Sequence, residues 1–117
     1  MYGVPVDIDL SFLPGKRLES ADFTQFQLQL RFDERVRLSI ESVYRIDKAG
    51  SVLVYDEIPA GAAEVVALLS MDVTNAYRLA EDAIRIEFGD SRALEAVDDS
   101  VQYECFQIWN GDAIIVV

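Results

Sequence analysis

Residues 26–41 alternate apolar and polar side chains with the period of a β-strand. The even positions from Phe26 to Phe32 and from Val36 to Ile40 are apolar, and the odd positions beside them are polar. Successive side chains of a strand point to opposite faces, so this pattern gives one apolar face and one polar face. The polar pair at positions 33 and 34 interrupts the alternation. The segment therefore predicts an antiparallel hairpin with one face in the core.

Residues 83–97 repeat this hairpin. Phe88 follows Phe32 at an offset of 56 (88 − 32 = 56), and the neighbouring apolar positions share that offset. Upstream the offset is 55, as for Ala21 and Ala76 (76 − 21 = 55), so a one-residue insertion near 78–80 reconciles the two. We predict a single domain over residues 1–117 with an internal duplication, whose repeat halves span about 13–58 and 68–117.

The remaining elements are also mostly strands. Residues 17–24 suit a strand, 43–46 and 52–55 suit a second hairpin, and the lead-in 1–12 is at best an edge strand because of Pro5. Residues 59–69 favour one short helix. Residues 75–83 score as helix, but the repeat favours a strand over 73–79 and a turn at 80–82. The expected fold is mainly β (α+β): two duplicated antiparallel β units forming a sandwich or partly open barrel, with one short connecting helix.

The last residues carry no polar face. Asn110-Gly111 predicts a tight hairpin turn, because both residues tolerate positive φ. The strand after it is apolar throughout, so we expect it to lie inside a sheet or at a homodimer contact. Its residues are Ala113, Ile114, Ile115, Val116 and Val117.

Charge and composition exclude several classes of function. With 21 acids and 10 bases the chain has a formal charge of −11, which disfavours nucleic acid and anionic membranes and favours basic partners. No apolar run is long enough for a membrane helix, and the first residues lack the pattern of a signal peptide. The single cysteine, Cys105, allows no internal disulfide, so a reducing cytoplasm is the expected location.

The chain lacks the residues of common catalytic and metal sites. It has no histidine, which removes histidine-activated nucleophiles and structural zinc. We therefore expect no cofactor, no metal and no enzymatic activity. Carboxylates are the remaining candidates, but their spacing matches neither a paired-carboxylate hydrolase nor a calcium loop. Cys105 lies among aromatic residues and is expected to be a buried, inert thiol.

The acids concentrate in the second half. Residues 1–58 hold 7 bases and 10 acids (net −3), and residues 59–117 hold 3 bases and 11 acids (net −8). We expect a partner-binding side formed by the hairpin's polar face and the segment after it, and its residues are Glu87, Glu95, Asp98, Asp99 and Glu104. The hypothesis is a protein that binds a basic partner there. Two alternatives stay open: these acids only keep the protein in solution, or a small ligand binds in the cleft between the two repeats.

The segment LEAVDDSVQYECFQI resembles the tail of a family of small acidic bacterial proteins that carry a domain of unknown function. The family pattern ends in V-x-D-D-S-x-x-Y-E-x-F-x-I, which Asp98, Asp99, Ser100, Tyr103, Glu104, Phe106 and Ile108 fit. Cys105 stands where the pattern has serine, and Val97 lies one residue nearer the acid pair. The family implies no activity. Size and acidity are similar to those of immunity proteins, which neutralise toxins.

Overall fold

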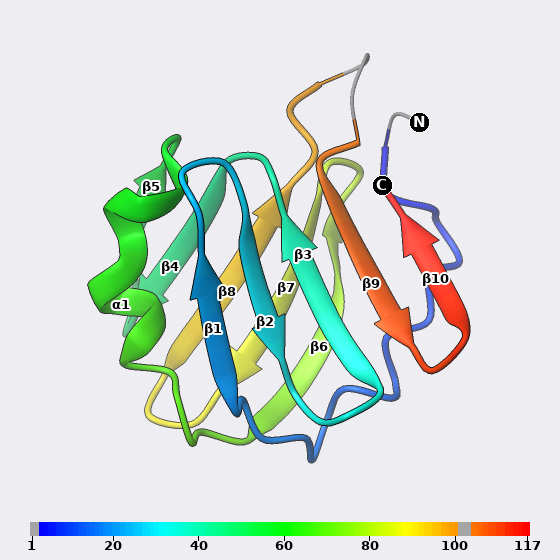
Figure 1. The fold of residues 1–117 in the computed structure, drawn as a ribbon, viewed down its shortest axis with the longest axis horizontal. Helices are drawn as coiled ribbons and strands as arrows, with labels where there is room; N and C mark the ends of the chain where they lie inside the picture. The colour runs from blue at the N-terminus through cyan, green and yellow to red at the C-terminus, as the bar shows by residue number, and fades with distance from the viewer. Residues whose placement is uncertain (1–2, 101–103) are drawn as a thin grey trace.

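The alternating segment forms the first hairpin of a two-layer β structure. The computed structural model describes residues 3–100 and 104–117, and in it two five-stranded antiparallel sheets face each other (Figure 1). The first sheet has the order β1 (Ser20–Phe23), β2 (Leu28–Arg31), β3 (Val36–Ile40), β9 (Phe106–Asn110), β10 (Ala113–Val116). The second has the order β5 (Ser51–Tyr55), β4 (Tyr44–Lys48), β8 (Arg92–Val97), β7 (Ala83–Phe88), β6 (Val73–Ala80). The mainly β fold with two antiparallel sheets is confirmed.

The two halves of the chain exchange hairpins between the sheets. Strands β1–β3 are completed by β9 and β10 from the second half, and β6–β8 are completed by β4 and β5 from the first half (Figure 1). The registers match: Leu38 pairs with Ile108 at the β3–β9 border, and Leu94 pairs with Ile46 at the β8–β4 border. Each sheet is thus built from both halves, where the sequence had suggested one compact unit per half.

A register shift in β6 lies where the two sequence offsets disagree. The pairing of β6 with β7 is irregular at two places, between Val73 and Asn75 and between Arg78 and Ala80, and the second lies at the expected insertion near 78–80. An irregularity of this kind inserts one residue into one strand of a pair. Residues 73–80 form this strand, one residue longer than the 73–79 that the repeat predicted, and the propensity for helix is overridden. Common ancestry of the halves stays a prediction.

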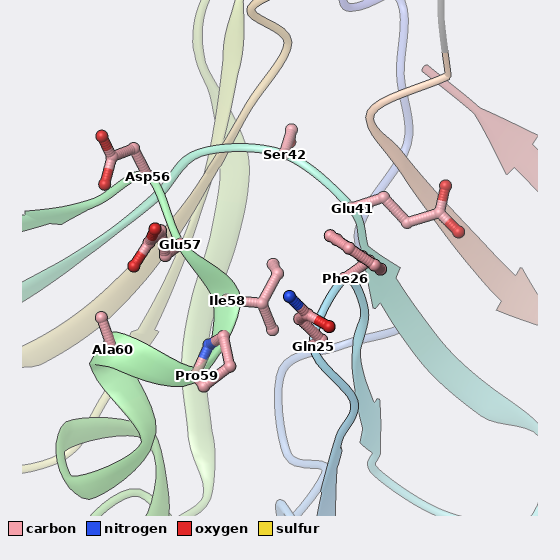
Figure 2. Close-up of a pocket in the computed structure, with 9 residues that line it drawn as sticks. All are labelled: Gln25, Phe26, Glu41, Ser42, Asp56, Glu57, Ile58, Pro59 and Ala60. Carbon is pink, nitrogen blue, oxygen red and sulfur yellow. The ribbon is translucent and has the colours of Figure 1, made fainter.

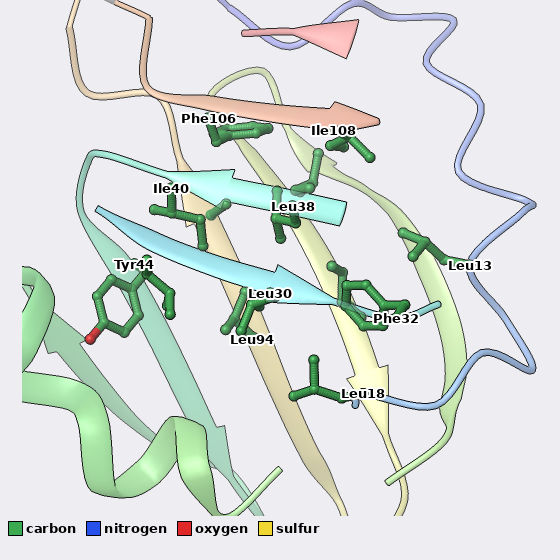
Figure 3. Packing of buried hydrophobic residues seen from close by; sticks show 14 of the residues in the cluster. Leu13, Leu18, Leu30, Phe32, Leu38, Ile40, Tyr44, Leu94, Phe106 and Ile108 are labelled. Carbon is green, nitrogen blue, oxygen red and sulfur yellow. The ribbon is translucent and has the colours of Figure 1, made fainter. Parts of the chain in front are cut away.

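The core fills the space between the inner faces of the two sheets (Figure 3). Phe32 and Phe88 are exposed by only 1% and 4%, so both repeat positions are buried. Burying an aliphatic or aromatic side chain of this size stabilises the fold by about 1.5–3 kcal/mol. The labelled side chains of this cluster are Leu13, Leu18, Leu30, Phe32, Leu38, Ile40, Tyr44, Leu94, Phe106 and Ile108.

The connection between the halves is helical but shorter than expected. A 3₁₀ turn, η1 (Ile58–Gly61), leads into α1 (Ala62–Val66), with Pro59 in the first turn. Gly61 lies at the junction and its backbone N–H donates to the hydroxyl of Tyr44. No helix among the described residues has the length and apolar character needed to cross a membrane.

Three expectations about the ends of the chain need correction. Residues 3–12 form no strand, although Val4 and Leu10 are buried in the core. Asn110 still pairs with Ala113, so the last turn sits one residue later, at Gly111 and Asp112. Among the described strands, β10 pairs with β9 alone and forms the edge of its sheet, so the expectation that it lies inside a sheet is wrong. The homodimer contact stays a prediction.

Candidate functional site

The five predicted site residues do not form one surface. Glu87 and Glu95 lie on the outer face of the second sheet, whereas Asp98, Asp99 and Glu104 follow β8 at one end of the sandwich. Glu95 is only 6% exposed, so its expected place on a solvated face is wrong. The alternation placed it on the correct face of the strand, but other side chains cover that face.

Arginines on the neighbouring strands cover Glu95. Arg45 on β4 and Arg85 on β7 are its direct cross-strand neighbours, at 2.7 Å (Nε to Oε1) and 2.8 Å (Nη1 to Oε2). Arg85 also contacts Asp47 and Glu87, and its hydrogen bond to Glu87 lowers the pKa of that carboxyl. Arg45 and Arg85 supply two positive charges to the three carboxylates of Asp47, Glu87 and Glu95, so most of the charge of Glu87 and Glu95 is compensated within the chain.

Asp98 is also internal. It is 2% exposed and accepts hydrogen bonds from the backbone N–H of Gly3 and, at 3.1 Å, from the Sγ of Cys105. Burial, together with this hydrogen bond, raises the pKa of Cys105 to about 11, which fits an unreactive thiol. Asp98 therefore joins Gly3 to the residue that precedes β9. Of the predicted set, only Asp99 and Glu104 are exposed. Tyr103 of the family pattern lies outside the described residues.

Asp99 and Glu104 line one part of a groove at this end of the molecule. Two adjoining cavities of about 580 and 600 Å³ share Phe26, Glu41, Ser42 and Asp56 (Figure 2). We call their combined lining the acidic groove. It consists of Gln25, Phe26, Gln27, Glu41, Ser42, Val43, Asp56, Glu57, Ile58, Pro59, Ala60, Asp99, Ser100, Glu104 and Cys105.

A buried tyrosine positions one wall of the groove. The hydroxyl of Tyr44 donates to the carbonyl of Ile58 and accepts the N–H of Gly61, and burial raises the pKa of Tyr44 to about 12. A side chain at Gly61 would collide with the Tyr44 ring. These hydrogen bonds fix Ile58 and Gly61 against the core. Ile58 directly follows Asp56 and Glu57, so the segment that carries these two acids is anchored at Ile58.

The opposite wall carries an exposed phenylalanine. The alternation placed Phe26 on the apolar face of the hairpin, but it lies in the turn before β2 and is 74% exposed. The side-chain oxygen of Thr24 accepts the N–H groups of Phe26 and Gln27, which holds the turn. The repeat carried a signal for this: at an offset of 56, Phe26 aligns with Asp82, a turn residue (82 − 26 = 56). In Figure 2, Phe26 and Gln25 lie on one side of this part of the groove, and Ile58 and Pro59 lie on the other.

The groove is uniformly negative. Glu41, Asp56, Glu57, Asp99 and Glu104 are all exposed, and none takes part in an ion pair among the described residues. No lysine or arginine lines it. The sequence pointed to Asp99 and Glu104 but missed the other three acids, which come from separate loops. An arrangement of this kind can bind cations, and it contains no desolvated acid of the type that hydrolases use.

Among the residues that the structure describes, no three acidic or cysteine side chains converge as ligands. Comparison with family models, curated proteins and solved structures found no match for this chain. The resemblance to the immunity-like family therefore stays a prediction.

Proposed function

We propose that this chain is a non-enzymatic binding protein that receives a basic segment of a partner protein in the acidic groove. The observation that carries this proposal is that five exposed carboxylates, none in an ion pair with a described residue, line the same groove as the exposed Phe26. In its finer form the partner is a toxin, as the resemblance to immunity proteins implies.

Charge repulsion within the groove favours a cationic ligand. Like charges gathered on one surface destabilise the free protein, and a basic partner relieves that repulsion. The exposed ring of Phe26 adds a second contact, because an aromatic face attracts a guanidinium or ammonium by about 0.5–1 kcal/mol at exposed sites. A lysine or arginine side chain that enters the groove meets carboxylates and an aromatic ring together.

A small ligand in the groove is the second candidate, and the size of one part of the groove favours it. The part of the groove between Phe26 and the wall of Ile58 and Pro59 encloses about 580 Å³, within the roughly 300–1,000 Å³ of small-molecule sites. This part is lined by the first half of the chain and the start of the connection that follows it. The neighbouring part, which contains Asp99 and Glu104, is lined by both halves.

Fluorescence anisotropy with a labelled peptide rich in arginine and lysine tests the main proposal. We expect saturable binding that weakens as salt rises, because screening acts on exposed charges within about 10 Å. The double substitution Asp56→Asn with Glu57→Gln should weaken binding about fivefold, from two exposed ion pairs of modest strength. Phe26→Ala should weaken it about threefold through the lost aromatic contact.

The matched control removes the same charge elsewhere. Glu19 and Asp90 are exposed and lie outside the groove. The double substitution Glu19→Gln with Asp90→Asn should change the peptide affinity by less than about twofold, because salt screens charges that lie far from the binding site. Equal loss in the groove variant and the control would show that only net charge attracts the peptide, and the groove would have no specific role. Binding indifferent to salt but lost in Phe26→Ala would favour the small-ligand candidate.

A further inference from the structure

One row of side chains crosses the outer face of the first sheet from edge to edge. The strand registers place each member directly beside the next, from β1 through β2, β3 and β9 to β10. The row reads Ser20, Arg31, Arg37, Trp109, Ile114. Ile114 is 49% exposed, so the row joins two cations, an aromatic ring and an exposed apolar side chain.

Arg31 and Arg37 face each other as like charges. Directly opposed like charges on neighbouring strands destabilise a sheet. Arg35, in the β2–β3 turn, adds a third cation at the same end of the sheet. None of the three forms an ion pair with a described residue. Each of the other seven bases contacts a carboxylate or, for Arg78, a backbone carbonyl: Lys16, Arg17, Arg45, Lys48, Arg78, Arg85 and Arg92.

The packing holds two of these guanidinium groups over β9 and its turn. The guanidinium carbon of Arg37 lies 5.0 Å from the ring centroid of Trp109, a cation–π contact. The guanidinium of Arg35 lies over Gly111 in the β9–β10 turn, where a Cβ atom would displace it. The backbone N–H of Gly111 also donates to the carbonyl of Arg35 at 2.8 Å. The β2–β3 and β9–β10 turns sit at the same end of the sheet (Figure 1).

We propose that this arginine–tryptophan row binds an acidic segment of a partner protein. Carboxylates of the segment pair with Arg31, Arg35 and Arg37, since guanidinium groups match carboxylates in a two-pronged geometry. An apolar residue of the same segment packs on Trp109 and Ile114. A nucleic acid offers similar anions, but the chain's net charge of −11 repels a long polyanion more strongly than a short acidic peptide.

Trp109 is the only tryptophan in the chain and lies within the row, so its fluorescence reports binding. The probe is a short peptide rich in glutamate and leucine, titrated across a salt series. We expect a saturable change in emission that weakens with salt. Arg31→Gln and Arg35→Gln should each reduce affinity about threefold or more, as expected for loss of an exposed ion pair.

Arg17→Gln is the matched control. Arg17 is exposed, and Arg17→Gln removes the same charge as Arg31→Gln. Arg17 pairs with Asp72 and lies away from the row. Equal weakening by Arg17→Gln and Arg31→Gln would overturn the proposal, as would the absence of a saturable signal. Oligothymidylate that binds more tightly than the peptide and loses affinity in the same variants would overturn it in favour of nucleic acid. Thermal unfolding of Arg31→Gln should show no loss of stability, because the substitution relieves a like-charge pair.

Discussion

Asp98 and Asp99 are adjacent in sequence and occupy opposite environments. Asp98 is buried and accepts hydrogen bonds from Gly3 and Cys105, whereas Asp99 is exposed in the groove. Of these two neighbouring aspartates, Asp98 is therefore structural and Asp99 is a candidate binding residue. The expectation that both residues belong to the partner-binding side therefore holds only for Asp99 as a proposal, because Asp98 is buried.

The two aspartates should separate in a stability measurement. Asp98→Asn replaces one buried acceptor oxygen by an amide that faces a donor, so it should lower the free energy of unfolding by about 1–3 kcal/mol. Asp99→Asn should change it by less than about 0.5 kcal/mol, as exposed charges contribute little. Urea unfolding of both variants measures this. Equal effects would show that Asp98 has no anchoring role.

The repeat positions Phe32 and Phe88 should be equally sensitive to truncation. Both are buried between the sheets, and either one changed to Ala should lower the free energy of unfolding by about 3–5 kcal/mol, from lost burial and the cavity left behind. Denaturant unfolding compares both variants with Phe26→Ala, which removes an exposed ring and should change the free energy of unfolding very little. A loss of under about 1 kcal/mol at either buried position would contradict this account of the core.

At the scale of elements, alternation predicted the strands well. The hairpins at 28–40 and 83–97, the strand over 73–80 and the turn after it follow from period and repeat offset. Alternation does not say which strand lies beside which, so the exchange of hairpins was not predictable. Alternation also does not say which side chains cover a face. For that reason it predicted Glu95 to be exposed, although Arg45 and Arg85 cover it. The groove gathers Glu41, Asp56 and Glu57 from separate loops, which no local pattern marks.

Strand β10 has a free edge and should pair with a second copy. Its Ile114 is half exposed, and among the described residues β9 pairs with one side of β10 and no strand pairs with the other, so that edge is open to a second copy. We expect dimers at micromolar concentration in sedimentation, strengthened by salt because screening weakens the repulsion between copies of charge −11.

Ile114→Lys tests that contact. A charge on the exposed face of β10 should shift the protein to monomer, whereas Val52→Lys on the edge strand β5 serves as the control and should not. A parent protein that stays monomeric at all accessible concentrations and salts would rule out the homodimer.

At the scale of the whole molecule, the charge is polarised. The acidic groove lies by the β1–β2 turn and the β3–β4 connection, and the arginine–tryptophan row lies toward the β2–β3 turn at the other end of the first sheet (Figure 1). A formal charge of −11 conceals this separation. Because the two surfaces are at opposite ends, occupation of one leaves the other open.

The exchanged hairpins also determine when the chain can fold. Strand β3 finds its second neighbour only in β9, with Leu38 and Ile108 separated by 70 positions (108 − 38 = 70), and β4 waits for β8. Such distant pairings carry a loop-closure cost and fold slowly. During synthesis the first half leaves the ribosome with two strand edges unpaired. Until the last strands emerge, those edges are exposed to other nascent chains and to chaperones.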